Sequence, residues 1–130
     1  MENVIKILPI IVVVLVVFLL REGLSFYRYV KYCKLHEAAK TGRIKKVRRL
    51  LEEGHPTDAV DPSFGLTPLH FAVRNGHVEV ARLLIENGAD LTQPSTQGIT
   101  PLDWTSAYLD TDQRAALLRV ADRNGDTDEV

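Results

Sequence analysis

The sequence predicts an all-α protein, a solenoid of about three helix-turn-helix repeats with short hairpin loops, preceded by one N-terminal transmembrane helix. The segment Gly65–Asp90 contains a Thr-Pro helix start and two short helical stretches with apolar faces. Its opening recurs later in the chain at Gly98–Asp103, and its body recurs earlier at Lys34–Gly54. The resulting period of about 33 residues is typical of stacked two-helix repeats. An apolar run before the repeats, Val4–Leu20, predicts the transmembrane helix.

Residues 1–22 form the predicted membrane anchor. Val4–Leu20 is apolar except for Lys6, and a helix of this length spans roughly 26 Å, the lower end of what a bilayer core requires. In lipid a helix satisfies its own backbone hydrogen bonds. Two alternatives stay open for this segment. One is a cleaved secretory signal, for which the basic n-region is weak, and the other is a buried helix of a soluble protein.

Charge is divided sharply along the chain. Residues 21–49, here called the basic collar, hold ten Lys and Arg against two Glu, a net charge of +8. Residues 50–130 hold five Lys and Arg against fourteen Asp and Glu, a net charge of −9. By the positive-inside rule, the collar places the N-terminus outside and the C-terminal domain in the cytoplasm. The collar either also contacts anionic lipid or only sets topology and keeps an outer helix solvated.

The rest of the chain divides into a basic, aromatic juxtamembrane segment (23–33), the repeats (34–123) and an acidic, disordered tail (124–130). The repeats are expected at 34–64, 65–97 and 98–123. In the second repeat, Thr67 is predicted as the N-cap and Pro68 as the first helical residue. Gly76 and Gly88 are predicted to end its two helices in left-handed backbone. In the third repeat, a fresh cap at residues 110–112 is predicted to start a helix over 113–121.

The run Thr67-Pro68-Leu69-His70, within Gly65–Asp90, resembles the ankyrin repeat family. The chain as a whole is similar to a small single-pass membrane ankyrin repeat-containing protein. The resemblance implies a protein-binding module without chemistry of its own. It also implies a structural role for His70, and for His36 at the equivalent position, because in the family this histidine hydrogen-bonds the threonine of its own repeat and neighbouring backbone. Asp103 takes this place in the third repeat and is expected to accept from its threonine in the same way.

The resemblance further implies a binding surface, built from the hairpin tips between repeats and the exposed ends of the first helices. The partner-binding residues carried over to this chain are Phe64, Leu66, Arg74, Asn75, Gln97, Ile99 and Tyr108. Phe64 and Tyr108 are the first candidates, because exposed aromatic groups cost solubility and tyrosine is frequent in binding hot spots. The alternative for Phe64 is packing against the loop over residues 57–62. Trp104 is expected to pack between repeats.

No catalytic, cofactor-binding or metal-binding residue is predicted. The histidines lack the spacing of zinc ligands, and the chain has neither a glycine-rich phosphate loop nor a G-x-S-x-G motif. The basic residues around Lys45-Lys46 suit phosphates, but aromatic side chains for base readout do not accompany them. We therefore expect no enzymatic activity, no cofactor and no nucleic-acid partner.

Together these features predict a membrane-anchored protein–protein interaction module. It would recruit, scaffold or restrain a partner at the cytoplasmic membrane face, with Val4–Leu20 in the lipid bilayer. The excess of carboxylates after Leu50 favours a partner with a basic surface. Two other interpretations stay open. One is a structural subunit or stabiliser of a larger membrane complex, and the other is an exported protein with a protective or inhibitory role.

Overall fold

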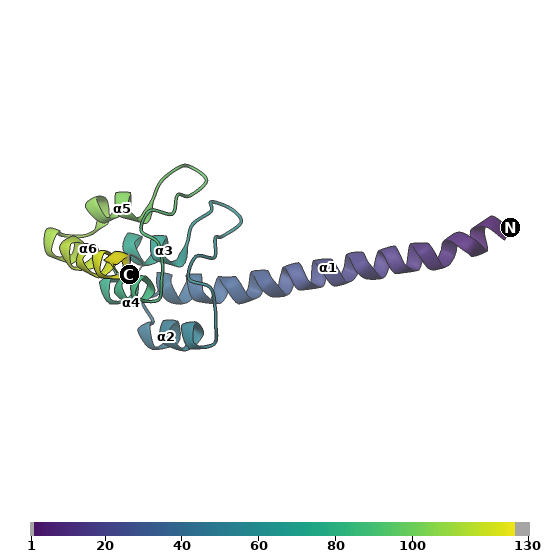
Figure 1. Cartoon of the computed structure of the whole chain (residues 1–130), viewed down its shortest axis with the longest axis horizontal. Helices are drawn as coiled ribbons and strands as arrows, with labels where there is room; N and C mark the ends of the chain where they lie inside the picture. Colours follow the sequence, from purple (N-terminus) through teal and green to yellow (C-terminus); the bar gives the residue numbers. More distant parts are fainter. Residues whose placement is uncertain (1, 127–130) are drawn as a thin grey trace. The chain divides into compact units, whose positions relative to one another are not determined.

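The structure is a computed structural model that describes residues 2–126, and the regular structure in this range is entirely helical (Figure 1). The prediction of an all-α fold is confirmed. The chain divides into two compact units, Met1–Lys31 and Tyr32–Val130. Helix α1 (Glu2–Lys40) contributes to both units.

The first unit is the apolar part of α1. The stretch Glu2–Tyr27 has a mean hydropathy of 2.9 in its most apolar window, and it is long enough to cross a membrane. An N-terminal signal sequence meets the same criteria of length and composition. Every side chain of Val4–Leu20 is exposed in the structure. A continuous apolar surface of this size needs a cover that the first unit itself does not provide.

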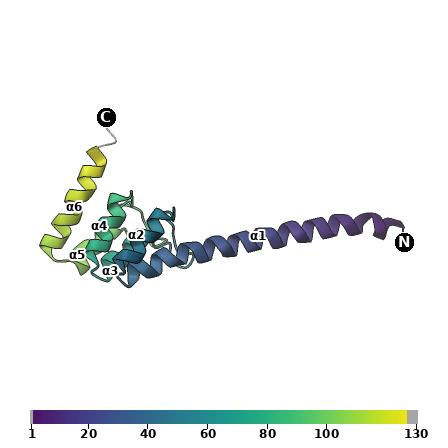
Figure 2. The ribbon, with the colours of Figure 1, turned by 90° about the horizontal axis from the view of Figure 1, so that it is seen from below.

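The second unit is a two-layer stack of helices. After the last turns of α1 come α2 (Ile44–Glu52), α3 (Pro68–Arg74), α4 (Val78–Glu86), α5 (Pro101–Tyr108) and α6 (Thr111–Asp126). Helix α4 packs against α2 and α6 in one layer, and α3 packs against α5 in the other (Figures 1 and 2). Contacts of α3 with α4 and of α5 with α6 join the layers.

One apolar core runs through the second unit. Its buried residues recur at helical spacing and include Leu35, Ala38, Ala39, Val47, Leu50, Leu69, Ala72, Val73, Val80, Ala81, Leu84, Leu117 and Val120. Helices α2, α4, α5 and α6 bury one face and leave the other in solvent, as expected for amphipathic helices, whereas the central α3 is buried except for Phe71 and Arg74. The alanines let neighbouring helices approach closely, so short helices build one continuous core.

The helix starts follow the predicted capping chemistry. Thr67 is the N-cap of α3 and Pro68 its first residue, and Thr100 and Pro101 have the same roles in α5. The Asp103 carboxylate accepts from the backbone N–H of Thr100 at 2.9 Å and from its hydroxyl at 2.8 Å. These bonds to the charged form hold the pKa of Asp103 below its ordinary value. The predicted role of Asp103 is confirmed.

Buried histidines connect successive repeats. The ring Nδ1 of His70 accepts from the backbone N–H of Thr67 at 3.0 Å. Since that nitrogen is an acceptor, the proton is on Nε2, which donates to the carbonyl of Ile99 at 3.0 Å. His36 makes the corresponding contact from Nε2 to the carbonyl of Leu66, also at 3.0 Å. The structural role predicted for His70 is therefore confirmed, and each bond reaches the residue just before the next helix cap.

The C-terminal helix is longer than predicted. Asp110 caps it as expected, because its carboxylate accepts from the backbone N–H of Gln113 at 2.8 Å. We predict a disordered tail from residue 124, whereas α6 continues to Asp126. The extra turn is held by Asn124, whose amide donates to the carbonyl of Ile85 at the end of α4. Residues 127–130 of the predicted tail lie outside the described residues.

Two turn glycines allow the cost of backbone strain to be compared with the cost of a steric clash. Gly42 and Gly54 have φ angles of 68° and 81°, in the left-handed region. A Cβ on Gly42 would lie 2.5 Å from Nδ1 of His77, whereas a Cβ on Gly54 would meet nothing within 4 Å. The His77 ring is held in place by its own bond from Nε2 to the carbonyl of Lys40, at 3.1 Å.

We predict that Gly42→Ala lowers the free energy of unfolding by about 2–3 kcal/mol, from left-handed strain plus the displaced His77 hydrogen bond. Gly54→Ala should cost only the strain, about 1–2 kcal/mol. The measurement is urea unfolding in detergent, followed by the fluorescence of Trp104, the sole tryptophan. In a His77→Ala background, the cost of Gly42→Ala should fall to that of Gly54→Ala. Equal costs of the two substitutions in the unmodified chain would contradict the steric account.

The burial of His70 predicts a pH-dependent stability. Burial lowers the pKa of His70 below its ordinary 6.5, against the opposing effects of the Ile99 carbonyl and Asp61. As pH falls below about 6.5, His70 takes up a proton in the unfolded chain but not yet in the folded chain, where its pKa is lower. Stability is therefore complete above that pH and is lost as pH falls through the folded pKa, by at most about 1.4 kcal/mol per pH unit. His70→Gln, which does not titrate, should have a shallower slope between pH 7.5 and 5, and an unchanged slope would refute this origin.

Candidate functional site

Two hairpin tips, one before α3 and one before α5, are fixed by internal hydrogen bonds. The carboxylate of Asp61 accepts from the backbone N–H groups of Ser63, Phe64 and Leu66. In the next loop, the hydroxyl of Ser95 accepts from the corresponding N–H groups of Gln97 and Ile99, both at 3.3 Å. Asp61 and Ser95 thus have the same role in successive hairpins, although the turn from Asp61 to Leu66 is one residue longer than the turn from Ser95 to Ile99.

The tips are also bonded to each other. The carbonyl of Phe64 accepts from the backbone N–H of Thr96 at 3.0 Å and from its hydroxyl at 2.9 Å. Gly65, with a φ angle of 66°, lies so close to the next loop that a Cβ would come within 3.0 Å of Thr96. The backbone that carries Phe64 is therefore fixed on both sides, while its side chain is 57% exposed. The alternative in which Phe64 packs against the loop over residues 57–62 does not fit this exposure.

Between the tips and the first helices of the repeats lies a groove of about 200 Å³. Its lining residues are Phe64, Leu66, Arg74, Ser95, Gln97, Ile99 and Trp104. They come from both hairpin loops, from the end of α3 and from the middle of α5. The exposed surface of the groove is mostly apolar, and Arg74 is the one charged residue among these lining residues. We call this site the inter-repeat groove.

Trp104 forms the centre of the inter-repeat groove. Its ring meets the edge of His70 at a centroid distance of 5.4 Å and the ring of Tyr108 at 6.0 Å, both in T-shaped geometry. The guanidinium carbon of Arg74 lies 5.8 Å from the Trp104 centroid, a cation–π distance. Among the described residues, Arg74 takes part in none of the ion pairs. Its charge is therefore held in position by an aromatic ring and is not neutralised by a carboxylate.

The structure brings most of the predicted binding residues together. Phe64, Leu66, Arg74, Gln97 and Ile99 all line the groove, although Leu66 is only 7% exposed and contributes little surface. Tyr108 is 49% exposed and joins the groove through Trp104. Asn75 is placed differently, since it is the C-cap of α3 and its amide donates to the carbonyl of Phe71 at 2.8 Å. Its side chain therefore serves the helix end. A role in binding stays a prediction for all seven residues.

Sequence reasoning assigned Trp104 to packing between repeats and did not include Ser95. Trp104 does pack on His70, and its remaining surface lines the groove. One signal was available, because Trp104 and Tyr108 occupy positions i and i+4 of a helix and so share a face. The sequence gives no comparable signal for Ser95, because at the period of 33 residues its counterpart is Pro62, and the turn before α3 is one residue longer.

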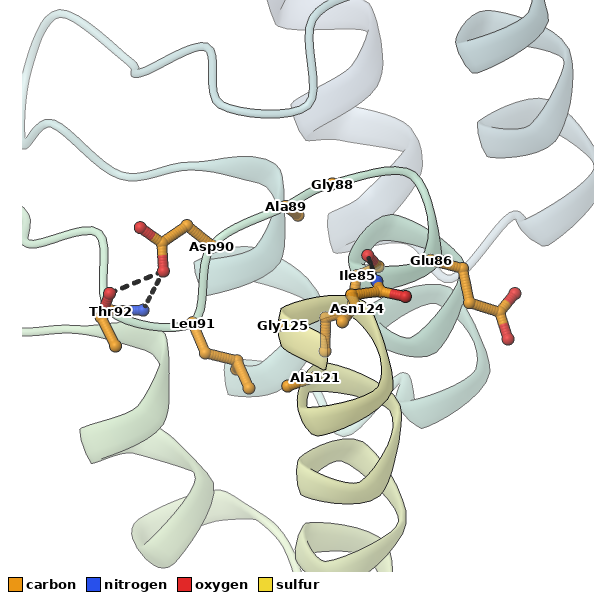
Figure 3. Close-up of a pocket in the computed structure, with 10 residues that line it drawn as sticks. All are labelled: Ile85, Glu86, Gly88, Ala89, Asp90, Leu91, Thr92, Ala121, Asn124 and Gly125. Carbon is orange, nitrogen blue, oxygen red and sulfur yellow. Dashed lines mark hydrogen bonds between the residues drawn. The ribbon is translucent and has the colours of Figure 1, made fainter. Parts of the chain in front are cut away.

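A larger hollow of about 520 Å³ lies between the end of α4, the following loop and the end of α6 (Figure 3). Its polar side chains already serve the fold. Asp90 accepts from the backbone N–H and the hydroxyl of Thr92, and Asn124 donates to the carbonyl of Ile85. No group of three His, Cys, Asp or Glu side chains within residues 2–126 is arranged to hold a metal ion. The inter-repeat groove is therefore the candidate site.

Comparison with known proteins gives matches to the repeats. The chain is 33% identical over 90 residues to SMC5-SMC6 complex localization factor protein 1 from Bos taurus, covering 68% of this chain and 8% of that protein. It is 39% identical over 67 residues to the 2-5A-dependent ribonuclease from Mus musculus, covering 52% and 9%. It is 38% identical over 71 residues to the ARF GTPase-activating protein GIT1 from Homo sapiens, covering 55% and 9%. The chain thus spans less than a tenth of the length of these relatives.

A family model described as ankyrin repeats (3 copies) matches residues 35–127. The match covers the last turns of α1 and all of α2 to α6, and it confirms the resemblance seen in the Thr-Pro-Leu-His motif. Ankyrin repeats are protein–protein interaction modules, which agrees with a groove lined by apolar and aromatic groups. The chain belongs to the ankyrin repeat family.

Proposed function

We propose that this chain is a membrane-anchored adaptor that recruits or restrains a protein partner through the inter-repeat groove. The observation that carries the proposal is the Arg74–Trp104–Tyr108 arrangement beside the exposed Phe64. Aromatic residues and arginine in well-packed surroundings dominate binding hot spots. The hairpin tips are fixed by hydrogen bonds before any partner arrives, so little loop-ordering entropy is lost on binding.

The groove specifies the chemistry of the segment that would enter it. Apolar side chains of the partner would cover Phe64 and Tyr108, and a carboxylate would pair with Arg74. Residues 50–130 carry a net charge of −9, so a basic surface around that segment would speed association at low salt. The long-range electrostatic field of the repeats would then increase the association rate, and the contact with Arg74 would fix the position of the partner's segment in the groove.

Membrane anchoring is the second part of the proposal. It is supported by the exposed apolar surface of Glu2–Tyr27 and by its mean hydropathy of 2.9. The ten basic residues of the collar support a cytoplasmic location for the repeats, by the positive-inside rule. A mature chain that begins at Phe26 would instead identify a cleaved signal and an exported protein. Protein sequencing of the N-terminus distinguishes these two cases.

The groove is tested by affinity capture of the tagged full-length protein from mild detergent. We expect one or a few proteins to be captured by the natural chain and lost from the Phe64→Asp/Tyr108→Asp variant, because two carboxylates would replace the exposed aromatic surface. Each lost hot-spot side chain should weaken binding by about 2 kcal/mol or more.

A matched control is available in Val60. It is an apolar residue in the same loop with a comparable exposure of 46%, and it does not line the groove. Val60→Asp should keep the captured partner. If the groove variant retains its partners while its Trp104 fluorescence unfolding curve is unchanged, the adaptor proposal is wrong. A structural role of the anchor within a larger membrane complex would then be favoured.

A further inference from the structure

The outer surface of α2 and its cap carries a run of positive charge. Arg43, Lys45, Lys46, Arg48 and Arg49, here called the α2 cationic face, are all exposed. Val47 and Leu50 point into the core from the same helix. Among the described ion pairs, only Arg49 of this set has a carboxylate partner, Glu53, at 3.1 Å on the surface. Such an exposed pair contributes little and leaves the face strongly positive.

Two of these cations, Lys45 and Lys46, work against the local stability of α2, whereas Arg49 lies in its last turn, where a cation is favourable. Arg43 is the N-cap and provides no side-chain cap, and the first turn of α2 contains no acidic residue. Lys45 and Lys46 lie in that first turn, where the helix dipole favours negative charge. The equivalent of Lys45 in the next repeat is Glu79, in the first turn of α4. Helix formation therefore does not explain the charges on α2.

Stacking explains why this face is polar. The residues of α4 equivalent to Lys46 and Arg49 are Val80, which is buried, and Leu83, which is partly buried, because α4 has a neighbour on that side. Helix α2 lacks that neighbour, so its outer face must be polar. Exposure to solvent explains why the outer face of α2 is polar, but it does not explain why the charges are positive.

Helix α6 ends the other side of the stack with the same requirement. Its exposed residues include both signs, with Asp112 and Asp122 beside Arg114 and Arg119. Polarity is therefore sufficient for a terminal helix, and a single sign is not needed. With its cap, α2 carries five exposed cations against Glu52 and the C-cap Glu53, and this excess of positive charge requires another explanation.

We propose that the α2 cationic face binds anionic lipid headgroups and holds the repeats against the membrane surface. This inference rests on the proposed membrane anchoring. The connection from Tyr27, the end of the apolar stretch, to Arg43 is short, and it would reach at most about 58 Å even if fully extended. An anchor on so short a connection keeps the face at a high effective concentration near lipid.

Charge complementarity selects the lipid. Lysine and arginine near an anionic leaflet each strengthen binding about fivefold. A single-stranded nucleic acid would be met by the same charges, but its bases stack on aromatic side chains, and the face defined above has none. The anionic bilayer is therefore the ligand that the face fits.

The test compares the full-length protein in nanodiscs of phosphatidylcholine alone with nanodiscs that also contain phosphatidylserine. Hydrogen–deuterium exchange is followed by mass spectrometry for α2 and, as an internal reference, for α4. We expect the α2 amides to exchange several-fold more slowly with phosphatidylserine, and high salt should abolish the difference because it screens exposed charges. The α4 amides should exchange equally in both discs.

Two triple variants with equal charge change separate this site from a general charge effect. Lys45→Gln/Lys46→Gln/Arg48→Gln should lose the lipid-dependent protection, whereas Arg82→Gln/Arg114→Gln/Arg119→Gln should retain it. The inference is overturned if α2 exchanges equally in the two discs, or if both variants lose the protection. An α2 protection produced by added RNA and not by phosphatidylserine would likewise replace lipid as the ligand.

The outcomes also separate this inference from the proposed function. If the protein fails to enter nanodiscs, the proposals of membrane anchoring and of lipid binding are both wrong. If it enters them and α2 shows no lipid dependence, only the lipid inference falls. The α2 variant should still capture the groove partner, because none of its substituted residues lines the inter-repeat groove.

Discussion

The hydrogen bond from His70 Nε2 to the carbonyl of Ile99 is the contact on which the fold and the groove jointly depend. It connects α3 of the second repeat to Ile99, the residue just before the Thr100 cap of α5. The same imidazole packs on Trp104, the centre of the groove, in T-shaped geometry. Burial favours the neutral imidazole by lowering the pKa of His70. The packing of the repeats and the shape of the groove therefore both depend on an uncharged His70. A change that weakens this contact therefore alters the binding surface as well as the stability.

In the hairpin tips, hydrogen bonds fix the backbone, and the exposed side chains give the surface its specific character. Asp61 and Ser95 each close a turn through their side chains, and the Phe64 carbonyl joins one tip to the next through Thr96. The backbone of the tips is thus determined by these few side chains and by the bond between the tips. The side chains that project from it are free to vary. Phe64 gives this chain an aromatic group where the following tip has Gln97.

Local signals made most of the fold predictable, and tertiary contacts explain what was missed. The Thr-Pro caps, the left-handed glycines and the apolar periodicity each depend on a few neighbouring residues. The repeat pattern then located five of the seven candidate residues in one groove. Trp104 and the end of α6 depend instead on contacts between repeats, with His70 and with the Ile85 carbonyl. An acidic sequence at the end of a chain contains no signal for that last bond.

The layer arrangement makes the two proposed surfaces compatible. Helices α3 and α5, which supply Arg74 and Trp104, form one layer of the second unit, and α2 belongs to the other layer with α4 and α6. A membrane bound by the outer face of α2 would therefore leave the inter-repeat groove uncovered. Like charge supports the same separation, because the acidic residues after Leu50 repel an anionic bilayer while α2 attracts it. If both proposals hold, the division of charge along the sequence would orient the repeats with the basic end toward lipid and the groove open to its partner.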